Sequence, residues 1–302
     1  MSEAHDPPAS SSPASRSHRI LTWFRSHKLK TILIVLFLYL TVELLTIPFF
    51  EILDLNDNNP SETALMRQRI EEARLRDKPP RIDKRWVSLS TIPKHVIDAI
   101  IVAEDGTFYS HSGIDWYEVQ ESIEKNLKVG RAARGASTIT QQLAKNLYLS
   151  TSKTPMRKLK EFVITKLLET NLSKGRILEI YLNVIEWGDG LFGIEAAAQT
   201  YFGKSVRELT LDEATRIAAV IPSPLRYKPN VDSRYVTLRR QIVLQRMMAR
   251  NFAKEPWVEG ETQGVAPELE TMPYEALPIP EFEDSLDFID STYIDEGRSN
   301  GL

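Results

Sequence analysis

An apolar run of twenty residues constrains this chain more than any other feature of its sequence. The run extends from Thr31 to Phe50, reads TILIVLFLYLTVELLTIPFF, and contains fifteen apolar residues. A helix of this length is about 30 Å long, which matches the hydrocarbon core of a lipid bilayer. We therefore predict a single transmembrane anchor over residues 30–50.

The charges on either side of this run predict its orientation. Residues 16–30 contain five lysines and arginines and no acidic residue, whereas Glu51, Asp54 and Asp57 follow the run. The positive-inside rule then places the N-terminus in the cytoplasm and the rest of the chain outside. A cleaved signal peptide is the alternative, but the run is too long for one and no A-x-A-like site follows it. Glu43 inside the run is either a functional group or a charge that reaches toward the headgroups.

Composition divides the rest of the chain. The absence of cysteine excludes a disulfide scaffold, a thiolate metal site and a cysteine nucleophile. The net charge is −3 over 302 residues, but residues 255–302 hold 13 acidic residues and only one basic residue. The body is therefore basic and is expected to meet an anionic partner. The predicted segments are a basic, disordered N-terminus (1–29), the anchor (30–50), a juxtamembrane helix and linker (51–85), a folded domain (86–254) and an acidic, disordered tail (255–302).

The spacing of apolar residues in the folded domain is mostly helical. Apolar residues recur every four positions over 159–167, and Thr210-x-x-Glu213 has the pattern of a capping box. Ser173 is expected to cap another helix, and Ser61 to cap the juxtamembrane helix. Few segments look like strands, so the predicted fold class is mainly α.

Four polar clusters interrupt this helical pattern between residues 104 and 183. The first begins with Glu104 and Asp105 at the predicted C-terminal end of a helix and continues with Phe108 and His111. The helix dipole and the neighbouring carboxylate both disfavour the charge on Glu104, which raises its basicity toward that of a general base. The alternative is an ordinary polar helix end.

The second cluster reads GASTITQQLAKN over residues 135–146. Thr138, Gln141 and Lys145 are spaced three and four apart, so they share one face of the predicted helix. Hydroxyl, amide and ammonium groups at the start of a helix suit the binding of sugars and phosphates. A plain solvated face is the alternative, although such a face more usually carries Glu and Lys.

The third and fourth clusters have both structural and functional interpretations. Arg157-Lys158-x-x-Glu161 is either an ion pair on a surface helix or a phosphate clamp that contains a second carboxylate. The fourth cluster, Lys174-x-x-Ile-Leu-x-x-Tyr181-Leu-Asn, is expected to belong mainly to the core.

In their order and spacing, these clusters closely resemble the motifs of the peptidoglycan glycosyltransferases, glycosyltransferase family 51, and in particular the monofunctional, membrane-anchored members. The matching motifs are E-D-x-x-F-x-x-H-x-G, G-x-S-T-I-T-Q-Q-x-x-K-N, R-K-x-x-E and K-x-x-I-L-x-x-Y-L-N. The resemblance runs from Trp86 to Tyr227 and includes a fifth segment that ends at Pro224. It implies a lysozyme-like, mainly α glycosyltransferase domain with two lobes and a cleft, behind a single N-terminal transmembrane helix.

The resemblance also implies an activity and a set of site residues. The enzyme would polymerise lipid II into β-1,4-linked glycan strands with inversion, release undecaprenyl pyrophosphate, and act on the outer side of the bacterial cytoplasmic membrane. Glu104 would take the proton from the acceptor hydroxyl, and Glu161 would assist near the leaving pyrophosphate. The implied substrate-binding residues are Asp105, Phe108, His111, Ser137, Thr138, Gln141, Gln142, Lys145, Asn146, Arg157 and Lys158.

The implied partners are lipid II, the growing glycan chain and the membrane, with transpeptidases or division proteins as further candidates and no nucleic acid. No cofactor is clearly required, and a divalent cation, Mg²⁺ or Mn²⁺, is left open. Two other classes of protein stay in view. A glycan-cleaving enzyme could share the lysozyme-like fold but would need no phosphate clamp, and a membrane-tethered scaffold would need no catalytic motif.

Overall fold

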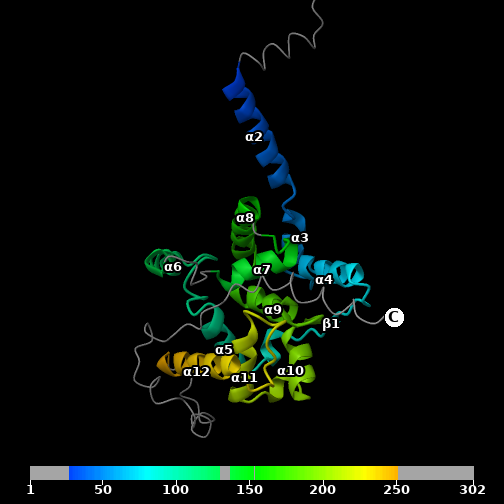
Figure 1. Ribbon diagram of the computed structural model, residues 1–302, viewed down its shortest axis with the longest axis vertical. Coiled ribbons are helices and arrows are strands. Elements are labelled where there is room, and N and C mark those ends of the chain that lie inside the picture. The colour runs from blue at the N-terminus through cyan, green and yellow to red at the C-terminus, as the bar shows by residue number, and fades with distance from the viewer. Residues whose placement is uncertain (1–26, 130–136, 153, 251–302) are drawn as a thin grey trace, which may run out of the picture. The chain divides into compact units, whose positions relative to one another are not determined.

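The computed structural model describes residues 27–129, 137–152 and 154–250 (Figure 1). The predicted acidic tail and all but the last residues of the predicted N-terminal segment lie outside these described residues. The chain divides into two compact units, Met1–Ile47 and Pro48–Leu302, and each is described by itself.

The first unit contains helix α2, Lys28–Leu45. The stretch Lys28–Asp54 is the part of the described chain that is long and apolar enough to cross a membrane. Helix α2 ends before residue 50 because Pro48 disfavours the helical conformation at the residue that precedes it. Length and composition thus support membrane attachment, and the orientation stays a prediction.

The second unit is built mainly from helices, so the predicted fold class is confirmed. Among the described residues of this unit, three short strands accompany the helices: β1 (Asp83–Lys84), β2 (Glu186–Gly188) and β3 (Leu191–Phe192). They form one sheet in the order β1-β3-β2, in which β3 is parallel to β1 and antiparallel to β2. The helices are α3 (Phe49–Asp54), α4 (Ala64–Leu75), α5 (Lys94–Glu104), α6 (Trp116–Val129), α7 (Ile139–Tyr148), α8 (Pro155–Asn171), α9 (Lys174–Val184), α10 (Ile194–Phe202), α11 (Leu211–Val220) and α12 (Arg234–Ala249), with 3-10 turns η1 (Leu89–Thr91) and η2 (Val206–Glu208).

Side-chain caps explain where several of these helices begin. The predicted capping box is present on α11, where Thr210 and Glu213 bond to each other's backbone N–H groups. Ser173 caps α9, as expected. The expectation for Ser61 is wrong, because α4 is capped by Thr63, which accepts a hydrogen bond from the N–H of Met66 at 3.1 Å.

Several helices of the second unit pack in two groups. Helix α5 packs against α11 and α12, and α7 packs against α8 and α9 (Figure 1). The juxtamembrane helix α4 packs on α7, and α3 packs on α8. A partly buried ion pair joins α4 to the sheet, because Arg69 Nη2 lies 2.7 Å from Glu186 Oε2. The predicted lobes, cleft and domain boundaries stay predictions, although α3 and α4 clearly pack on this body.

Candidate active site

Glu104 is the last residue of α5, and its carboxylate meets groups from α7 and α12. Gln142 Nε2 donates a hydrogen bond to Glu104 Oε2 at 2.8 Å. Arg239 Nη2 lies 4.0 Å from Glu104 Oε1, a distance that allows charge attraction but no hydrogen bond. Within the described part of the chain, Oε1 accepts no hydrogen bond, so Gln142 engages only one of the two carboxylate oxygens.

Burial raises the pKa of the Glu104 carboxyl above its usual value. The side chain is 9% exposed, and the negative charge of Asp105 raises the pKa further. Arg239, Arg246 and the hydrogen bond from Gln142 act in the opposite direction without cancelling the increase. The direction is the one expected from the sequence, but burial contributes more to it than Asp105 does.

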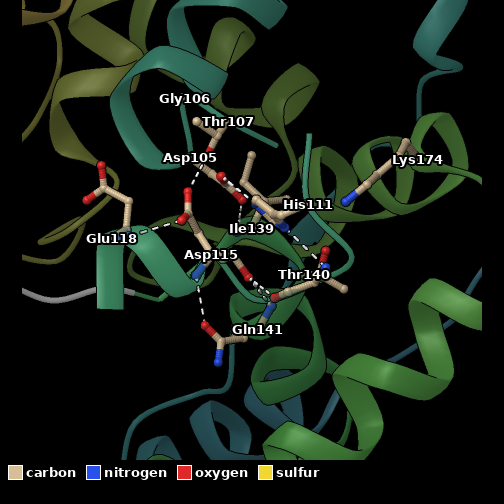
Figure 2. A network of polar contacts seen from close by, with 12 residues as sticks. Asp105, Gly106, Thr107, His111, Asp115, Glu118, Ile139, Thr140, Gln141 and Lys174 are labelled. Carbon is tan, nitrogen blue, oxygen red and sulfur yellow. Dashed lines mark hydrogen bonds and ion pairs between the residues drawn. The ribbon is translucent and has the colours of Figure 1, made fainter. Parts of the chain in front are cut away.

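Asp105 ties the end of α5 to the start of α7 (Figure 2). One of its oxygens lies 2.9 Å from His111 Nε2, and the other accepts the N–H of Ile139 at 3.0 Å. His111 Nδ1 accepts the N–H of Gly113 at 3.1 Å, so Nε2 carries the proton that is donated to Asp105. Both Asp105 oxygens are therefore engaged inside the protein.

The turn at Gly113, which contacts the start of α7, requires a glycine. Its φ of +87° lies in the left-handed region that favours glycine. A Cβ there would lie 2.7 Å from Thr165 Cγ2 and 2.8 Å from Glu169 Cγ. The carbonyl oxygen of Gly113 accepts a hydrogen bond from Thr138 Oγ1 at 2.7 Å, which fastens this turn to α7.

The predicted sugar-binding face of α7 is mostly occupied by contacts within the protein. Thr138 and Gln141 form a capping box, in which the Thr138 N–H donates to Gln141 Oε1 at 3.0 Å. Both side chains are buried, as is Asn146, another predicted substrate-binding residue. Phe108 is fully buried as well, with Lys174 Nζ 4.3 Å from the centre of its ring.

The charges of two carboxylates, Glu104 and Glu161, both act on Lys145. Burial lowers the pKa of its ammonium group, and attraction from Glu161 and Glu104 opposes that change. Arg157 and Lys158 lie close enough to lower the pKa of Lys145 further by repulsion. The structure thus brings both glutamates, which are 57 residues apart in sequence, to the same lysine.

Glu161 holds the other two cations of the site. Arg157 Nη1 donates to one of its oxygens at 2.5 Å, and Lys158 Nζ donates to the other. Glu161 is 3% exposed, so the interpretation of this cluster as an ion pair on a surface helix does not fit. Lys158 is 51% exposed, and its Nζ lies 3.5 Å from the hydroxyl of Ser137, which is exposed as well.

Two residues that contact this site were not singled out from the sequence. Tyr181 was assigned to the core, and it is fully buried, but its hydroxyl donates to Gln142 Oε1 at 3.0 Å. Arg239 lies on α12, beyond the motifs. The signal that could have found it is the density of arginines in α12, which contains four, at positions 234, 239, 240 and 246.

No three or more His, Cys, Asp or Glu side chains of the described residues lie close enough together to hold a metal ion. The donor set therefore does not fit a cation bound by protein groups alone, and we derive no step through Mg²⁺ or Mn²⁺.

Comparison with known proteins identifies the family of this chain. The family model described as transglycosylase matches residues 71–248. A biosynthetic peptidoglycan transglycosylase of Nitrosospira multiformis is 46% identical over 204 residues, which cover 68% of this chain and 89% of the relative. A protein of the same name from Methylobacillus flagellatus is 45% identical over 199 residues, which cover 66% of this chain and 87% of the relative.

The fold is mainly α, the site contains a buried carboxylate and a group of cations, and the family match shows that the class of protein is a transferase. The extent of the family match and of these similarities shows the family. This chain belongs to the transglycosylase family.

Proposed function

We propose that this protein is a peptidoglycan glycosyltransferase that polymerises lipid II into β-1,4-linked glycan strands for the bacterial cell wall. The observation that carries the proposal is the electrostatic effect of two carboxylates on Lys145: Glu104, whose pKa is raised and whose Oε1 accepts no hydrogen bond within the described part of the chain, and Glu161, which binds Arg157 and Lys158. The names of the similar proteins support the same activity.

The reaction balances with these groups alone. Glu104 Oε1 accepts the proton of the acceptor sugar's 4-hydroxyl. At the same time, the oxygen of this hydroxyl forms a bond to the anomeric carbon of the donor. The bond from this carbon to the pyrophosphate oxygen breaks, and undecaprenyl pyrophosphate leaves with its electron pair. Because the donor linkage is α and the product is β, a single in-line displacement suffices, and no nucleophile of the enzyme is required.

The cations of the site are assigned to the leaving pyrophosphate. Lys145, Arg157 and Lys158 would neutralise the charge that develops there, and Glu161 would hold the last two in place. Lys158 and Ser137 offer exposed donors to a ligand. We reassign Asp105, Phe108, His111, Thr138, Gln141 and Asn146 from direct substrate binding to the support of α5 and α7, because their side chains are mostly buried or bonded within the protein.

Membrane attachment fits this function. Both substrates are lipids of one leaflet, so an anchored enzyme meets them at a raised effective concentration. We propose an N-terminus in the cytoplasm and a catalytic body on the outer side of the cytoplasmic membrane.

The test is polymerisation of purified lipid II by the full chain in detergent. We expect glycan polymer and undecaprenyl pyrophosphate to accumulate together. Purified cell wall serves as the second substrate, because release of soluble muropeptides from it would indicate glycan cleavage instead. Failure to turn over either substrate would favour a scaffold.

A further inference from the structure

Tyr181, Gln142 and Glu104 form a chain of hydrogen bonds that joins three helices. The hydroxyl of Tyr181 on α9 donates to Gln142 Oε1 at 3.0 Å. Gln142 Nε2 on α7 donates to Glu104 Oε2 at 2.8 Å, at the end of α5. The chain therefore starts in the core and ends on the carboxylate that we assign as the base.

Tyr181 determines the donor–acceptor direction of this chain of hydrogen bonds. Tyr181 is fully buried, and burial raises the pKa of its phenol well above the usual value, so the hydroxyl stays protonated. A protonated hydroxyl pointing at Gln142 holds the carbonyl end of the amide on its own side. The NH₂ end must then face Glu104. Without this hydroxyl, the amide could turn its oxygen toward the carboxylate, where the two would repel.

We propose that Tyr181 is a positioning residue for the general base. Acting through Gln142, it holds Glu104 Oε2 so that Oε1 stays directed at the acceptor hydroxyl. The proposal rests on the proposed function for its catalytic consequence, but the orientation itself is a property of the protein alone.

The charges that face Glu104 are not altered by changing this tyrosine. Tyr181 is neutral, so its replacement by phenylalanine removes one hydrogen bond and no charge. The titratable groups that act on the Glu104 site come from the end of α5, from α7 and from α12. They are Asp105, Lys145, Tyr235, Arg239 and Arg246.

The principal test compares Tyr181→Phe with Tyr201→Phe. Tyr201 is a matched control, because its hydroxyl also makes one hydrogen bond within the protein, to the carbonyl oxygen of Trp187 at 2.9 Å, away from Glu104. For Tyr181→Phe we expect turnover of lipid II to fall about 10- to 100-fold, as for a misplaced catalytic group, with KM little changed. Tyr201→Phe should keep wild-type turnover.

The pH profile separates positioning from a loss of packing. A hydrogen bond to the charged carboxylate favours that form, so weakening it should move the acidic limb of the rate profile to higher pH in Tyr181→Phe. Tyr201→Phe should leave the limb where it is. Gln142→Leu removes the intermediate donor and should move the limb in the same direction as Tyr181→Phe.

A double-mutant cycle tests whether Tyr181 acts through Gln142. In a Gln142→Leu background, Tyr181→Phe should cause little further loss. The proposal would be overturned if the fold-losses in turnover of the two single variants multiply in the double variant. It would also be overturned if Tyr181→Phe matches Tyr201→Phe in turnover and in the acidic limb of the pH profile.

A titration without substrate tests the role of Tyr181 even if lipid II is not the substrate. Carboxyl carbons of ¹³C-glutamate-labelled full chain in micelles can be followed by NMR, with the Glu104 signal assigned from Glu104→Gln. We expect this signal to titrate at higher pH in Tyr181→Phe than in Tyr201→Phe. An inactive wild type would refute the proposed function, whereas equal titrations in the two variants would refute the role of Tyr181.

Discussion

Replacement of Glu161 by glutamine distinguishes a buried cation holder from an ordinary helix ion pair. The wild-type carboxylate is 3% exposed and accepts hydrogen bonds from Arg157 and Lys158. Glutamine keeps the shape of the side chain but removes its charge. Arg157, whose side chain is only 17% exposed, would then lose its anionic partner.

The expected size of the effect follows from this burial. Removing one partner of a fully buried ion pair costs about 3–5 kcal/mol. Two features reduce that cost here, because Lys158 is half exposed and the amide oxygen of glutamine can still accept one hydrogen bond. We therefore expect Glu161→Gln to lose about 1–3 kcal/mol of unfolding free energy. For a domain of about 150–250 residues, this corresponds to a fall in Tm of about 2–12 °C.

Glu71→Gln is the matched control for this measurement. Glu71 forms an ion pair with Arg74 at 3.6 Å on the surface of α4, and both side chains are more than half exposed. Such a pair contributes about 0.2–0.5 kcal/mol, so its loss should lower Tm by no more than about 2 °C.

Activity provides the second readout for Glu161. Initial polymerisation rates against lipid II concentration should show a severe loss of turnover and a raised KM in Glu161→Gln, because Arg157 and Lys158, the cations that we assign to the pyrophosphate, lose their anionic partner. Glu71→Gln should match wild type in both. If Glu161→Gln behaves like Glu71→Gln in melting and in rate, Glu161 is only an ion-pair partner and the reasoning fails.

Three further predictions concern the proposed base Glu104, the turn at Gly113 and the acidic tail. Glu104→Gln should reduce turnover about 10²–10⁴-fold, as loss of a general base does. Because the pKa of Glu104 is raised on folding, its ionisation costs stability, so Glu104→Gln should melt at or above wild type at pH 8, with the difference shrinking as the pH falls. Gly113→Ala should lower Tm in a thermal melt, since a Cβ would lie 2.7 Å from Thr165 Cγ2 at a φ of +87°. A chain that ends at Lys254 should still fold and polymerise lipid II, and retention of less than about a tenth of the activity would contradict the predicted boundary.

Local rules account for much of the agreement between sequence and fold. The capping box at Thr210 and Glu213 and the cap at Ser173 depend on residues within one turn, so their spacing reveals them. The same rule fails at Ser61, because Thr63 lies two residues further on and takes the cap instead. Which of two nearby hydroxyls caps a helix depends on the packing of that helix, here on α7.

The site could be predicted only in part, because its contacts join segments that are distant in sequence. The motifs place Glu104 and Glu161, but their spacing cannot show that one lysine, Lys145, feels both charges. Arg239 lies 135 positions after Glu104, and only the packing of α12 on α5 brings it near. Tyr181 has the burial of a core residue, so periodicity alone hides its hydrogen bond.

The two carboxylates of the site differ in how many of their oxygens accept hydrogen bonds, and this difference supports the roles that we propose for them. Both oxygens of Glu161 accept hydrogen bonds from cations, one from Arg157 and the other from Lys158. Glu104 has one oxygen held by Gln142, while the other accepts no hydrogen bond within the described part of the chain. Burial raises the pKa of Glu104 and thereby strengthens its free oxygen as a base. These contacts support our proposal that Glu104 accepts the proton and that Glu161 holds positive charge where the pyrophosphate would leave.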